Sequence, residues 1–180
     1  MTVGAVLAGL AAHPRQNLID RWNWKSALLS AGLRGAIFFS ANLTVSLDAA
    51  VRAMAVDATF RIPMVGVYAA VIQAFADAEP PWLAACVVTV AVPAVAHGVE
   101  FTVHAIARTP ALAVSVAASV AFSILSSAFN LFAMRHGALR VGPRSSSFRS
   151  DVRRFPGLVV AFVVAGPMAV IRAIRGLLAP

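Results

Sequence analysis

The sequence predicts an all-α integral membrane protein: a bundle of four to five transmembrane helices preceded by an N-terminal interfacial amphipathic helix. Two observations lead to this expectation. Of the 180 residues, 60% are hydrophobic and only 12% are charged, whereas a typical globular domain is roughly half apolar and about a quarter charged. The apolar residues also gather into segments that approach the length of about 20 residues that a spanning helix needs.

The N-terminal segment, residues 1–25, is expected to lie at a membrane surface. Its second half mixes apolar and charged residues with Trp22 and Trp24, and tryptophan is enriched where a bilayer meets water. The remainder, residues 26–180, is expected to form a single transmembrane domain.

Breaks between apolar segments define the candidate spans. Pro80 and Pro81 separate the second span from the third, because proline cannot continue a helix and restricts the residue before it. The last segment contains Arg172 and Arg175 after a short apolar stretch, so it either crosses the membrane or lies on its surface. The candidate spans are 26–47, 62–78, 82–106, 110–134 and 156–178.

The charge distribution suggests an orientation. Lys and Arg total 15 against 7 Asp and Glu, a net charge of +8, and cytoplasmic loops carry the surplus of basic residues in membrane proteins. We therefore expect a basic cytoplasmic loop at 135–154 and a cytoplasmic N-terminus, in a bacterial inner membrane. Nucleic acid is not an expected partner, since no aromatic residues alternate with the basic ones. The residues expected to contact anionic lipid headgroups are Arg140, Arg144, Arg149, Arg153 and Arg154.

Four polar residues in the third span share one helical face. His97, Glu100, His104 and Arg108 fall within an arc of about 80° on a helix, and ionisable groups inside a membrane mark candidate functional sites. The face is either wet and paired within itself, or a relay for ions or protons, or a metal site. For a metal, His97, Glu100 and His104 would be the ligands of zinc or iron, although their spacing is not the H-E-x-x-H of zinc proteases. No other cofactor is expected.

Two further sets of polar residues lie within candidate spans. Arg34 is predicted near the middle of the first span, where it needs a partner such as Asn130, a backbone carbonyl or a phosphate. A stripe of small polar residues in the fourth span shares a face with Asn130 and is typical of close helix packing. This packing stripe consists of Ser115, Ser119, Ser123 and Ser126.

No nucleotide-binding or nucleophile motif is present in the sequence. We therefore interpret the chain as a non-enzymatic membrane component, such as a small subunit or assembly partner that binds other helices in a homo-oligomer or a complex. One alternative is a small oligomeric transporter or channel with a polar route along His97, Glu100 and Arg34. A further alternative is a membrane-embedded metal-dependent enzyme.

Overall fold

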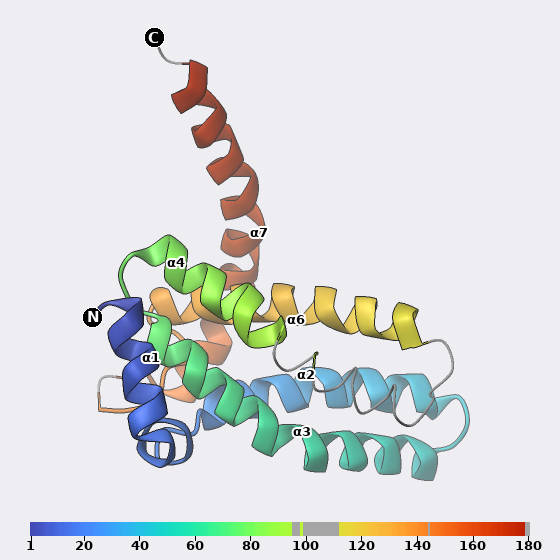
Figure 1. Cartoon of the computed structure of the whole chain (residues 1–180). Helices are drawn as coiled ribbons and strands as arrows, with labels where there is room; N and C mark the ends of the chain where they lie inside the picture. The colour runs from blue at the N-terminus through green and yellow to red at the C-terminus, as the bar shows by residue number, and fades with distance from the viewer. Residues whose placement is uncertain (95–97, 99–111, 144, 179–180) are drawn as a thin grey trace.

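A computed structural model describes residues 1–94, 98, 112–143 and 145–178 (Figure 1). Within these ranges nearly all of the regular structure is helical, with a single isolated bridge between Thr2 and Glu79. The elements in chain order are α1 (Val3–Ala12), the π-helical turn η1 (Arg15–Ile19), α2 (Trp24–Leu43), α3 (Leu47–Phe75), α4 (Pro81–Cys86), the π-helical turn η2 (Val87–Ala91), α6 (Leu112–Arg135) and α7 (Phe148–Leu178).

The predicted bundle of transmembrane helices is wrong. Among the helices in the described ranges, none combines the length and the apolar character that crossing a bilayer requires. The placement in a bacterial inner membrane, with its cytoplasmic N-terminus, was deduced from the same spans and is corrected by the same finding.

The prediction of spanning helices failed because of where the helices begin and because of which apolar residues they contain. α3 runs without interruption through 48–61, which was expected to be a loop, and it therefore carries Asp48 and Arg52 in its first turns. Much of the apolar composition is alanine, whose small side chain contributes little hydrophobic surface.

Helices α2 and α3 form a long antiparallel hairpin (Figure 1). Ser46 caps α3, because its Oγ accepts a hydrogen bond of 3.1 Å from the backbone N–H of Ala49, as a helix N-cap does. The two helices approach closely at Gly35, where a Cβ atom would lie 3.1 Å from Cγ of Met54. Glycine at this position therefore allows the tight contact within the hairpin.

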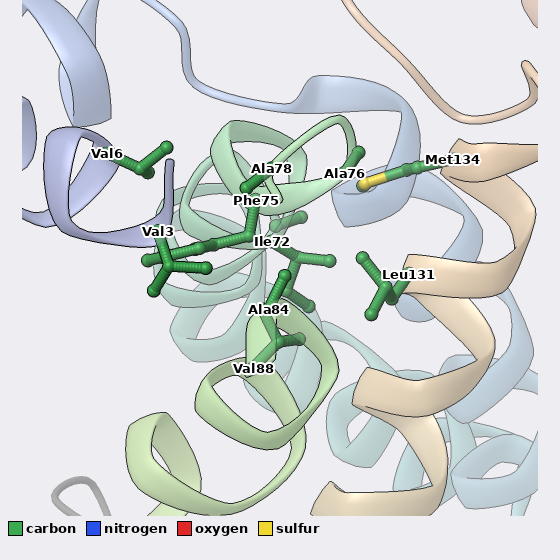
Figure 2. Packing of buried hydrophobic residues seen from close by; sticks show 11 residues of the cluster. Val3, Val6, Ile72, Phe75, Ala76, Ala78, Ala84, Val88, Leu131 and Met134 are labelled. Carbon is green, nitrogen blue, oxygen red and sulfur yellow. The ribbon is translucent and has the colours of Figure 1, made fainter. Parts of the chain in front are cut away.

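The main hydrophobic cluster lies where four segments meet, and Figure 2 shows it from close by. Phe75 and Ile72, from the last turns of α3, are fully buried at its centre. Val3 and Val6 reach it from α1, so that this helix packs into the protein core. In place of the interfacial helix predicted in the second half of 1–25, the structure has η1 and the start of α2. The remaining buried members are Ala69, Ala76, Ala78, Ala84, Val88, Leu131 and Met134.

A second, smaller cluster joins α7 to the rest of the molecule. Leu158 of α7 is buried there beside Leu139, and Phe129 of α6 stacks edge-on against Phe155 and Phe162 of α7, with ring centroids 5.4 and 5.5 Å apart. The described contacts come from one face of the first half of α7. The helix then continues away from the other helices towards the C-terminus (Figure 1).

Candidate functional site

The predicted polar face of the third span lies outside the described residues. This applies to His97, Glu100, His104 and Arg108 alike, so the relay and metal hypotheses on that face stay predictions. Among the residues that the structure does describe, no three His, Cys, Asp or Glu side chains gather as metal ligands would.

Arg34 and the first half of the packing stripe are described only by their backbone. Arg34 lies in α2, and Ser115 and Ser119 lie in α6, as helical residues. Further along α6, the amide of Asn130 donates a hydrogen bond of 2.9 Å to the backbone carbonyl of Ser126. Asn130 therefore binds its own helix, and the described contacts do not pair it with Arg34.

A serine outside the predicted stripe makes the contact between α6 and α3. The hydroxyl of Ser127 lies 2.9 Å from the Tyr68 hydroxyl, and it also donates a hydrogen bond of 2.6 Å to the carbonyl of Ser123. Burial raises the pKa of Tyr68, an effect partly opposed by its hydrogen bond with Ser127. No local pattern in the sequence distinguishes Ser127 from its serine neighbours.

The expected basic loop is divided between a structured turn and the start of α7. Arg140 pairs with Asp77, and Arg154 donates a hydrogen bond of 2.9 Å to the carbonyl of His136. Arg149 and Arg153 are exposed on α7 and make no ion pair with any described residue. Arg144 lies outside the described residues. Within the predicted lipid-contact set, Arg149 and Arg153 are therefore the described arginines that have no polar partner among the described residues.

Asn23 is a buried hub that sequence reasoning did not identify. Its side-chain amide donates to the side-chain oxygen of Gln73 at 3.0 Å and to the carbonyl of Leu139 at 2.8 Å. Its own oxygen accepts from the backbone N–H of Ser26 at 3.1 Å, which caps α2. Gln73 in turn holds Val141 through two hydrogen bonds of 2.8 Å. An asparagine just before a helix is an N-cap signal, but nothing local in the sequence indicates the distant partners.

A buried ion pair fixes the start of α7. Nζ of Lys25, the chain's one lysine, lies 2.9 Å from Oδ2 of Asp151, and the two side chains are 2% and 0% exposed. Ser146 completes the group, because its carbonyl accepts from Lys25 and its hydroxyl donates to Asp151. Burying two charges is tolerated only where each is paired and hydrogen-bonded. The pair thus links the first turn of α2 to the first turn of α7.

The face of α7 that points away from this ion pair is exposed. Val160, Val163 and Val164 are 64%, 64% and 53% exposed, and on a helix they lie opposite Asp151, Leu158 and the two phenylalanines that pack inward. Arg149 and Arg153 project from the same outer face nearer the base of the helix. We call these five residues the α7 outer face.

Comparison with known proteins gives no relative from which a function could be transferred. The chain matches no protein family, no curated protein and no solved structure. Any functional proposal must therefore come from the contacts and surfaces described above.

Proposed function

We propose that this chain is a non-enzymatic assembly protein that binds a second copy of itself through the α7 outer face. The observation that supports the proposal is the exposure of Val160, Val163 and Val164 on a helix that leaves the rest of the molecule (Figure 1). Contiguous exposed apolar residues mark sites of interaction. On the opposite face of α7, Leu158 and Phe162 pack against the rest of the molecule. The helix is therefore held in place while its outer face stays exposed.

An antiparallel partner of the same sequence would place the exposed valines of both copies at one twofold crossing. Residue 163 lies halfway between the ends of the helix, Phe148 and Leu178. In an antiparallel pair with twofold symmetry, the valines of the two copies would meet at the crossing. Arg153 stands about ten residues from that point, so the two copies of Arg153 would lie about 30 Å apart at about 1.5 Å per residue.

The size of this contact sets the expected strength of the association. A helix of 31 residues is about 46 Å long, and a single pair of such helices buries less than the roughly 800 Å² per partner of a standard interface. We therefore expect a reversible dimer with a dissociation constant in the micromolar range. The transporter and metalloenzyme alternatives depend on residues that lie outside the described ranges or, like Arg34, are described only by their backbone, and no described contact favours them.

The test is sedimentation velocity of the purified chain over a wide range of concentrations. We expect the wild-type protein to shift from monomer to dimer, and the double variant Val160→Glu/Val163→Glu to stay monomeric, because it places acidic groups at the crossing. Val90→Glu is the matched control, since Val90 of η2 is also exposed, at 58%. A wild-type protein that is monomeric throughout, or a double variant that associates as well as the control, would refute the proposal.

A lipid surface is the competing occupant, because the arginines beside the valines would suit anionic headgroups. Flotation with vesicles containing anionic phospholipid separates the two. If the double variant loses vesicle binding while the wild-type protein stays monomeric without vesicles, the face binds lipid and the dimer proposal is wrong.

A further inference from the structure

A small pocket lies between the turn after η1, the end of α3 and the chain segment around Arg140. Its volume is about 240 Å³, and its lining includes the short side chains of Ala70 and Ala74 from α3. The polar side chains around it include Arg21 and Arg140. Ligand pockets are commonly about 300 Å³ or more, so this one suits a ligand of few atoms.

We propose that this pocket binds a small anion, a phosphate or a short carboxylate, between the guanidinium groups of Arg21 and Arg140. Arginine suits such a ligand because its planar fork of N–H donors matches the oxygens of both anions. The proposal is independent of self-association through α7, since the pocket contains no residue of that helix.

The backbone on each side of Arg21 is held in place. Before it, the N–H of Asp20 donates to the carbonyl of Arg15 at 3.1 Å. After it, the indole N–H of Trp22 donates to the carbonyl of Pro63 at 3.0 Å, and the next residue is bonded through its backbone to α3. Arg21 therefore starts from a fixed position, although its own side chain forms no hydrogen bond or ion pair with the described residues.

Arg140 is fixed in the same way from the opposite wall. Its neighbours Leu139 and Val141 are bonded to Asn23 and Gln73 respectively. Because Asn23 also bonds Gln73, one buried network sets the position of both walls. Such pre-organisation lowers the entropy lost when a ligand binds.

The charges at the pocket are positive in sum. Arg21 and Arg140 face a single carboxylate, Asp77, which pairs with Arg140. Asp77 takes up two of the five N–H donors that a guanidinium offers. Arg135 lies close enough to act on the same carboxylate, since its charge, after the hydrogen bond and charge of Arg140, helps lower the pKa of Asp77. Arg21 is thus a cation at the pocket that has no carboxylate partner among the described residues.

The experiment is a thermal-unfolding titration of the full chain with inorganic phosphate and, separately, with succinate, at constant ionic strength in chloride. A ligand that binds only the folded state raises the unfolding midpoint in a saturable way. We expect saturation with at least one of the two anions. The anion that saturates identifies the ligand class as phosphate or carboxylate.

Two charge-matched variants test the position of the site. Arg21→Gln should weaken the apparent affinity at least tenfold, and it should fold normally because the side chain has no partner among the described residues. Arg15→Gln removes the same charge from the first residue of η1, which does not itself line the pocket, and should leave the affinity within twofold of the wild-type value. The proposal is overturned if neither anion saturates, or if Arg21→Gln binds as tightly as Arg15→Gln.

Discussion

The buried pair of Lys25 and Asp151 makes the sharpest prediction about stability. Asp151 is fully buried and accepts hydrogen bonds from Lys25 and Ser146. Replacing it with leucine introduces an apolar side chain of similar size. The buried ammonium of Lys25 is then left with the carbonyl of Ser146 as its hydrogen-bond acceptor. Breaking one side of a buried pair costs about 3–5 kcal/mol, so Asp151→Leu should lower the free energy of unfolding by that amount.

Urea unfolding followed by circular dichroism measures this loss. For a slope of about 2 kcal/mol per molar urea, the midpoint should fall by about 1.5–2.5 M. The double variant Lys25→Met/Asp151→Leu should recover most of the stability, because well-packed apolar residues can replace a buried pair at little cost.

The exposed pair of α3 is the matched control for this experiment. Asp48 and Arg52 lie 2.9 Å apart, but their side chains are 72% and 78% exposed, and such pairs contribute at most about 1 kcal/mol. Asp48→Leu should therefore change the free energy of unfolding by less than that. A loss below about 1 kcal/mol for Asp151→Leu, or no recovery in the double variant, would refute the role assigned to the buried pair.

Two further predictions concern the surroundings of the pocket. A Cβ atom at Gly66 would lie 1.9 Å from Nε1 of Trp22, so Gly66→Ala should displace the indole and destabilise the fold by about 1–3 kcal/mol; an unchanged urea midpoint would contradict this. Asp77 has a lowered pKa, mainly through its hydrogen bond to Arg140, so its contribution is complete above the unfolded value of about 3.9 and is lost as the pH falls through the lower folded value. Asp77→Asn should therefore reduce the loss of stability below about pH 4 while changing neutral stability little, which urea midpoints measured from pH 2 to pH 7 would check.

Local features of the fold could be read from the sequence, because they depend on neighbouring residues. The break at Pro80 and Pro81 was expected, and α4 begins at Pro81. The first apolar segment was expected to begin at residue 26, and α2 begins at Trp24. These elements follow from the rigidity of proline and from an apolar run, both of which act within a few residues.

The surroundings of the helices could not be read in the same way. An apolar run of helical length is consistent with burial in lipid or in protein, and composition alone favoured lipid. The structure instead buries Phe75 and Ile72 between helices, and α3 continues through the charged stretch that was taken for a loop. The difference lies in long-range packing, which the period of apolar residues does not encode.

The candidate sites were missed for a related reason. Asn23 and Leu139 are separated by 116 positions, and Lys25 and Asp151 by 126. No spacing rule relates residues so far apart, whereas the predicted polar face on the third span was visible because its members repeat every helical turn. Sequence reasoning therefore favours clusters on one helix over networks that join several.

Cysteine cross-linking of α7 tests the proposed assembly most directly. Cys86 is the chain's one cysteine, so Cys86→Ser provides a background free of thiols. In that background, Val163→Cys places a thiol at the proposed crossing and Arg153→Cys places one about ten residues away. Antiparallel self-association predicts that mild oxidation gives a covalent dimer of the Val163→Cys protein and leaves the Arg153→Cys protein monomeric. Equal cross-linking of both variants, or none for Val163→Cys at concentrations well above micromolar, would contradict the account.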